Sequence, residues 1–158
     1  MPTADGPPER LGAMPIDALV AKLGSDAITP GAGAAGTIVL ALAAACASKA
    51  IAITAKHRAL PAALVDAARS IEELGRAALH GADEDVEHFR TYLRHRDAEK
   101  ADELRESDRT LLELCESLKE IVDRISADVH EVVAGDISAA RVLTQAAAAI
   151  HLRNEATT

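Results

Sequence analysis

Three aspartates are the first candidates for chemistry, because each is expected at a helix boundary among small residues. Asp26 precedes a glycine-rich turn, Asp85 stands early in a charged helical segment, and Asp136 precedes an alanine-rich segment. A carboxylate in such a place can cap a helix and balance its dipole, or it can act as an acid or base beside a ligand. Spacing along the chain is compatible with both roles.

The glycine-rich turn after Asp26 is the second candidate. Residues 29–33 read TPGAG and open an apolar helix, whose first backbone N–H groups can hold an anionic group. Residues 31–36 also have the form GxGxxG, but no strand precedes them, so a dinucleotide site is not indicated. The glycines can equally serve close packing, and both interpretations stay open.

Histidines and cysteines show no spacing typical of a metal site. Cys46 and Cys115 lie in apolar stretches, which favours buried, reduced thiols over a disulfide. The six histidines are expected to be solvated on charged helix faces: His57, His80, His88, His95, His130 and His151. We therefore expect no bound metal.

These residues must be positioned by helices, since no segment alternates as a half-buried strand does. Apolar spacing predicts helices over residues 16–23, 34–56, 61–80, 83–94 and about 97–134, followed by an alanine-rich helix. Gly81 and Gly135 are expected to end the helices that precede them. Residues 34–47 are small or aliphatic on all sides, which is typical of a central helix.

The predicted helix 97–134 carries a sustained apolar stripe. Its members recur every seven residues, which suits a helix that stays in contact with a neighbour in an antiparallel bundle or a dimer: Leu104, Leu111, Leu118, Ile125 and Val132. We predict an all-α fold, an antiparallel helical bundle of about five to six helices. Residues 13–158 form one domain, and residues 1–12, rich in proline and glycine, form a flexible tail.

Composition excludes several classes of partner. The net charge of -8, with one Phe, one Tyr and no Trp, lacks both the basic patch and the stacking surfaces of a nucleic-acid-binding protein. The uncharged stretch 27–48 has the length of a membrane span, but its glycines and alanines favour a buried core helix. The first 15 residues lack an apolar leader, so we expect a cytoplasmic protein.

Three segments, in this order along the chain, resemble the formiminotetrahydrofolate cyclodeaminase and methenyltetrahydrofolate cyclohydrolase family. Residues 23–33, LGSDAITPGAG, resemble its S-D-x-P-T-P-G-G-G segment, and residues 82–89, ADEDVEHF, its D-x-D-A-x-A-F segment. Residues 135–154 are similar to its S-D-x-G-V-A ending, which closes on an asparagine. Departures include Ala32 and Ala34 in the turn, Ile150 in place of a glycine, and a shorter linker before residue 110.

The resemblance implies a homodimeric helical bundle that opens or closes C–N bonds of a methenyl- or formimino-tetrahydrofolate, as a cyclohydrolase or an ammonia-releasing cyclodeaminase. No covalently bound cofactor is implied. Asp26 and Asp136 are then closest to the chemistry, Asp85 is a supporting acid, and all three are expected in one cleft. The implied ligand-binding residues lie in the turn, after the central helix and near the end of the chain: Thr29, Pro30, Gly31, Gly33, Lys56, His57, Arg58 and Asn154.

Two other functions fit the same residues. The altered turn and shorter linker suit an enzyme of this scaffold that acts on a smaller imine or amidine biosynthetic intermediate. The third possibility is a helical dimer without catalytic activity that binds a ligand or a partner protein.

Overall fold

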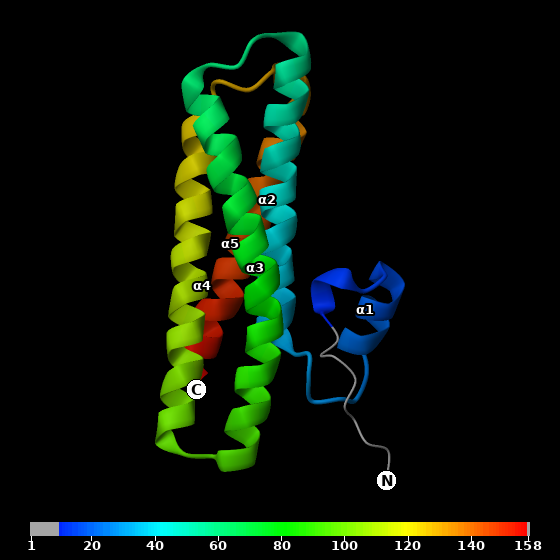
Figure 1. The fold of residues 1–158 in the computed structure, drawn as a ribbon, viewed down its shortest axis with the longest axis vertical. Helices are drawn as coiled ribbons and strands as arrows, with labels where there is room; N and C mark the ends of the chain where they lie inside the picture. The colour runs from blue at the N-terminus through cyan, green and yellow to red at the C-terminus, as the bar shows by residue number, and fades with distance from the viewer. Residues whose placement is uncertain (1–9, 158) are drawn as a thin grey trace.

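Four long segments of the chain form helices whose apolar sides face one another. The computed structural model describes residues 10–157, which fold into α1 (Ile16–Leu23), α2 (Ala32–His57), α3 (Ala62–His95), α4 (Ala98–Ile125) and α5 (Ala134–Thr157). Two 3-10 helices, η1 (Leu11–Ala13) and η2 (Glu131–Val133), complete this part of the chain. Helices α2 to α5 form an antiparallel bundle, and α1 lies beside it (Figure 1). No strand occurs among the described residues, so the predicted all-α class is confirmed.

Helix α2 is the apolar centre of the bundle. It packs along α3 and α5, which in turn pack along α4, so that α2 and α4 face each other diagonally. Its alanines at positions 43, 47 and 50 are wholly buried, which lets the neighbouring backbones approach closely. Among the described residues, only α2 is long and apolar enough to span a membrane, with a mean hydropathy of 2.0. A bundle core helix has the same composition.

Helix α3 continues through the glycine that was expected to end it. Gly81 is buried in the middle of α3, and a Cβ there would lie 3.0 Å from the Leu111 side chain of α4. The glycine therefore brings α3 close to α4. The helices predicted over 61–80 and 83–94 are one helix because this close packing offsets the low helix propensity of glycine, about 1 kcal/mol.

The predicted helix 97–134 ends earlier than expected. Helix α4 ends at Ile125, a turn and η2 follow, and Gly135 and Asp136 both lie in the first turn of α5. Val132, the last member of the stripe, is 65% exposed, whereas the other four members are buried. They face α3 and α5, so the chain itself covers the stripe.

The N-terminal segment packs on the bundle from Leu11 onward. Leu11 is buried in a small cluster with Leu19, Ala34 and Ala82, and its backbone N–H donates to Asp83 Oδ1 at 2.8 Å. The tail predicted over 1–12 thus includes packed residues at its end, and residues 1–9 lie outside the described part.

The two ends of the bundle differ in construction. At one end lie the α2–α3 and α4–α5 connections, and we call it the distal end. At the other, α3 and α4 extend past the start of α2 and the end of α5 before they join (Figure 1). We call this the cleft end, because the extended α3–α4 pair and the two helix termini enclose a cleft there.

Candidate functional site

The cleft has a volume of about 340 Å³ and is lined by four helices and one loop. Residues 28 and 29 of the α1–α2 loop and the first turn of α2 form one wall. The opposite walls come from α3, α4 and α5: Asp85, Phe89, Tyr92, Leu104, Asp108, Asn154 and Thr157. A ligand in this cleft would therefore contact both carboxylates and the N-terminus of α2.

Asp85 of α3 caps α2 from the neighbouring helix. Its carboxylate accepts a hydrogen bond from the backbone N–H of Ala34 in the first turn of α2. A Cβ on Gly33 would overlap Asp85 Oδ1 and lie 2.8 Å from its Cγ, so only glycine lets the carboxylate approach. The glycine turn thus serves close packing, and a carboxylate of the protein satisfies a helix N–H that could otherwise bind an anion.

The pKa of Asp85 is raised from 3.8 to about 6. Burial contributes most to the rise, and the nearby Asp108 carboxylate adds to it, while His151, the Ala34 N–H and His88 oppose it. A carboxyl group with a pKa near neutrality can both accept and donate a proton at working pH. Such a group in a cleft is a strong candidate for an acid–base catalyst.

Asp108, His151 and Thr37 form a buried polar cluster behind the cleft. Nδ1 of His151 lies 2.8 Å from Asp108 Oδ1, and its Nε2 lies 3.2 Å from Thr37 Oγ1. The Thr37 hydroxyl also donates to the carbonyl of Gly33 at 2.8 Å. The imidazole of His151 is fully buried. The cluster links α2, α4 and α5 at the level of the cleft.

The expectation that His151 is solvated is wrong, and its burial has a signal in the sequence. On α5 it continues the buried series Ala140, Thr144, Ala147 at alternating steps of four and three. On α4, Asp108 likewise stands between buried Leu104 and Leu111. A polar residue at a core position of an amphipathic helix needs a buried partner, and here the two polar residues satisfy each other.

The aromatic residues of the protein gather at the cleft. Its one Phe and one Tyr, Phe89 and Tyr92, both line it, with ring centroids 6.3 Å apart and ring planes tilted by 39°. Aromatic faces attract cations, as carboxylates do. The combination of rings with Asp85 and Asp108 favours a planar, positively charged group in the ligand.

Several predicted site residues lie at this cleft. Thr29, Gly31, Gly33 and Asn154 line it together with Asp85. The Thr29 hydroxyl accepts a hydrogen bond from Arg90 Nε at 3.0 Å, which ties the loop to α3.

Two predicted residues of the same loop do not line the cleft. The buried Pro30 faces a neighbouring cavity between α3 and the N-terminal segment. Asp26 is exposed in the loop.

Other predicted site residues lie at or toward the distal end. Asp136 is in the first turn of α5, where its Oδ1 lies 3.6 Å from Lys49 Nζ, whereas Asn154 is in the last turn of this 24-residue helix. Lys56, His57 and Arg58 end α2, whose 26 residues correspond to a length of about 39 Å. His57 stacks on His130, and Arg58 donates to the carbonyl of Asp128.

The prediction of one cleft for all three aspartates is therefore wrong within a single chain. The physical reason is that α2 and α5 both run along the bundle. Residues near opposite ends of the same helix, such as Gly33 and His57, are separated by most of its length. The order of residues in the sequence does not show how long each helix is, and therefore which residues lie at the same end of the bundle.

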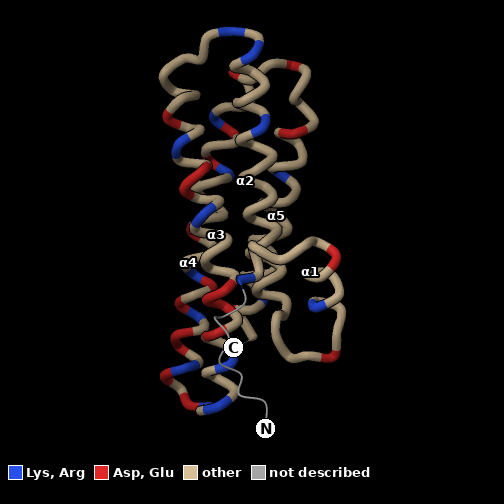
Figure 2. The backbone as a smooth tube through the Cα atoms, turned by 45° about the vertical axis from the view of Figure 1, so that its right-hand side comes forward, with Lys and Arg blue, Asp and Glu red and all other residues tan. Residues whose placement is uncertain are grey.

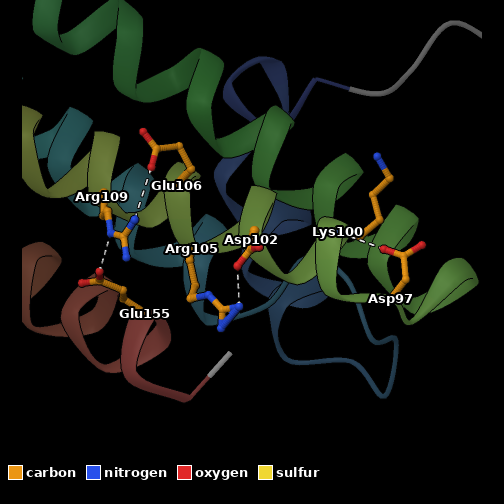
Figure 3. A network of polar contacts seen from close by, with 7 residues as sticks. All are labelled: Asp97, Lys100, Asp102, Arg105, Glu106, Arg109 and Glu155. Atoms are coloured by element: carbon orange, nitrogen blue, oxygen red, sulfur yellow. Dashed lines mark hydrogen bonds and ion pairs between the residues drawn. The ribbon is translucent and has the colours of Figure 1, made fainter.

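An ion-pair network holds the last turn of α5 against α4 beside the cleft. Arg109 Nε lies 2.7 Å from Glu155 Oε1, and its Nη1 lies 3.5 Å from Glu106 (Figure 3). Arg105 pairs with Asp102 at 2.6 Å further along α4. Such exposed pairs are worth about 1 kcal/mol or less each. The Arg109–Glu155 pair joins α4 to the turn of α5 that carries Asn154.

Among residues 10–157, no group of three or more His, Cys, Asp or Glu side chains is arranged to hold a metal ion.

A family model described as formiminotransferase-cyclodeaminase matches residues 15–154. The crystal structure of formiminotetrahydrofolate cyclodeaminase from Thermotoga maritima, at 2.80 Å resolution, is similar with a TM-score of 0.85 and 17% sequence identity. The match covers 93% of this chain and 79% of that chain. No curated protein matches. At this identity the structural likeness concerns the fold, which agrees with the predicted helical bundle.

Proposed function

Because the chain belongs to the formiminotransferase-cyclodeaminase family, we propose that its cleft performs C–N bond chemistry on a methenyl- or formimino-tetrahydrofolate. The observation that supports this most directly is Asp85, whose pKa is raised to about 6 at the wall of a cleft that also holds two aromatic rings. The reacting carbon of such a substrate lies between two nitrogens in a planar, positively charged group. The reaction requires no covalently bound cofactor.

Binding of the charged group precedes the chemistry. The rings of Phe89 and Tyr92 provide faces for the planar group, and the Asp108 carboxylate provides a negative charge. The positive charge also opposes the repulsion between the two carboxylates, which lowers the pKa of Asp85 when the ligand is bound. Asp85 then enters the reaction as a base.

Asp85 moves the proton in either reaction. In hydrolysis, Asp85 takes a proton from water as the water oxygen bonds to the cationic carbon. Asp85 then gives this proton to one nitrogen of the adduct as its C–N bond breaks, and the hydroxyl group loses its own proton to become the formyl oxygen. In cyclodeamination, the folate nitrogen next to the one that carries the formimino group attacks the formimino carbon and gives its proton to Asp85, which passes it to the departing amine so that ammonia leaves. One carboxyl group whose pKa lies near neutrality serves both sequences.

The test compares two Asp→Asn variants at opposite places in the bundle. Asp85→Asn keeps an acceptor for the Ala34 N–H but cannot exchange the proton, so turnover falls by about 10²-fold or more. Asp136→Asn is the matched control, because Asp136 forms only a partly exposed ion pair away from the cleft. Turnover is followed through the methenyl chromophore and released ammonia. Full activity of Asp85→Asn, or equal loss in both variants, contradicts the proposal.

A smaller imine or amidine is the second candidate substrate. No Lys or Arg is among the residues that line the cleft, and the cations expected to hold the folate carboxylates, Lys56 and Arg58, lie at the distal end. The anionic tail of a folate therefore extends out of the cleft, whereas a small amidine needs no such partner. Thermal stabilisation by amidines without a pterin, and none by tetrahydrofolates, favours this second substrate class. Stabilisation without turnover favours a binding protein without catalytic activity.

We also propose that the protein is a homodimer, joined through α2 and α5 rather than through the α4 stripe. Exposed apolar side chains lie on these helices, including Leu42 at 47%, Val142 at 61% and Leu152 at 61% exposure. Charged residues concentrate on α3 and α4, while α2 and α5 are mostly uncharged (Figure 2). We propose that a second copy of the chain, and not a membrane, covers this apolar surface.

The net acidic charge disfavours nucleic acid as a partner. We place the protein in the cytoplasm, where Cys46 and Cys115 stay reduced.

A further inference from the structure

The buried cluster behind the cleft contains a titratable group that the proposed reaction does not use. His151 is fully enclosed by α2, α4 and α5, and its two ring nitrogens contact Asp108 and Thr37. Gly36 of α2 faces the same ring, because a Cβ there would lie 3.2 Å from Nε2. An imidazole enclosed in this way must have both nitrogens satisfied by these neighbours.

Hydrogen-bond geometry fixes where the protons of this cluster lie. A threonine hydroxyl has a single hydrogen, and the carbonyl oxygen of Gly33, 2.8 Å from Thr37 Oγ1, can only accept, so we assign the hydrogen to this contact. Towards the imidazole, Thr37 Oγ1 can then only accept, so Nε2 of His151 is the donor at 3.2 Å. Nδ1 faces a carboxylate oxygen at 2.8 Å, and an ionised carboxylate only accepts. Both nitrogens therefore carry hydrogen.

We propose that His151 is a positioning residue, a buried imidazolium that holds Asp108 as an ionised carboxylate at the wall of the cleft. The cleft then pairs a fixed negative charge, on Asp108, with a carboxyl group that exchanges its proton, on Asp85. Two neighbouring carboxyl groups in different environments divide the roles of charge and proton transfer between them. The catalytic meaning of this arrangement rests on the proposed function, but the protonation of His151 does not.

The surroundings of Asp85 agree with this division of roles. Titratable groups face it from α3 (His88), from α4 (Asp108) and from α5 (His151), and α2 contributes the Ala34 N–H. Asp108 raises the pKa of Asp85 and His151 lowers it. Because Asp108 acts from the cleft wall and His151 from behind it, the imidazolium shields Asp85 only in part.

The test is nuclear magnetic resonance of the full chain labelled with ¹⁵N on histidine and ¹³C on aspartate carboxyls, at neutral pH and without substrate. The expected result is a directly bonded hydrogen on both ring nitrogens of His151 and an ionised Asp108. A His151 ring with one bare nitrogen, or a protonated Asp108 carboxyl, overturns the proposal. The measurement on the unmodified protein requires no variant to fold.

Two variants distinguish a charge pair between Asp108 and His151 from simple packing of the two side chains. Asp108→Asn keeps the size of the side chain but removes its charge, so His151 should lose one ring proton and the carboxyl titration of Asp85 should move to lower pH. Asp102→Asn, an exposed position on the same helix, should change neither signal. An unchanged His151 ring in a folded Asp108→Asn protein contradicts the pairing. If the unmodified protein shows the expected protonation of the His151 ring but does not turn over the folate substrate, only the proposed function is refuted.

Discussion

The raised pKa of Asp85 makes a prediction about stability that is independent of any substrate. In the unfolded chain this carboxyl has a pKa near 3.8, and in the folded chain its pKa is about 6. Below pH 3.8 the group is protonated in both states and contributes nothing. As pH rises from 3.8 through 6, the unfolded state loses its proton first, so the folded state loses stability. Above pH 6 the loss is complete.

The size of this loss follows from the shift. Each pKa unit corresponds to 1.36 kcal/mol, so the Asp85 carboxylate lowers the free energy of unfolding by about 3 kcal/mol at pH 8. Asp85→Asn removes the charge while its side-chain oxygen still accepts from the Ala34 N–H. We therefore expect the variant to be about 3 kcal/mol more stable at pH 8, or about 6–12 °C in Tm. At pH 3.5 the difference should vanish.

Urea unfolding at both pH values, followed by circular dichroism, measures this difference. Asp136→Asn serves as the control, because its partly exposed ion pair with Lys49 is worth about 1 kcal/mol or less. A variant at position 85 that is less stable than the unmodified protein at pH 8 would refute the reasoning. It would show that the charged cap on α2 stabilises the fold by more than burial of the charge destabilises it.

Three further predictions concern the turn, the assembly and the thiols. Gly33→Ala should displace the Asp85 carboxylate and reduce turnover by about 10²-fold, while stability stays within about 1 kcal/mol because better helix propensity offsets the weakened cap. Gly135→Ala, whose added Cβ meets nothing within 4 Å apart from its chain neighbours and the nearby backbone of its own helix, should keep full activity in the same assay. Leu42→Glu should convert the dimer to a monomer in light scattering, and a monomeric unmodified protein would reject the proposed interface. Burial raises the pKa of Cys115 to about 11, so mass spectrometry at pH 8 should find it alkylated only after unfolding; alkylation in the folded state would show that the site opens.

Much of the fold follows from local patterns in the sequence. Apolar spacing predicts α1 over residues 16–23, as observed, and the all-round apolarity of residues 34–47 identifies α2 as the central helix. Gly81 misleads because glycine both ends helices and permits close contacts. The choice between these depends on the Leu111 side chain, which belongs to another helix. Such information is absent from the local sequence.

The site is predictable where it rests on motifs and unpredictable where it rests on packing. The family resemblance points to the glycine turn, Asp85 and Asn154, which meet at one cleft. It also points to Asp136, which the length of α5 carries away from that cleft. Asp108 and His151 interrupt apolar stripes on two helices, and only the packing of α4 against α5 reveals that these interruptions are partners.

Hydrogen exchange tests the central claim, the position of the ligand, most directly. The cleft end and the distal end, which both contain residues predicted to bind the ligand, lie at opposite ends of the 26-residue α2. Exchange can therefore be measured separately at each end on different peptides. With a methenyl- or formimino-tetrahydrofolate bound, exchange should slow in residues 28–34, 85–92 and 104–108. Residues 49–58 and 130–136 should exchange at the rate of the free protein. Protection confined to residues 49–58 and 130–136 would contradict the assignment of the cleft at Asp85 as the binding site.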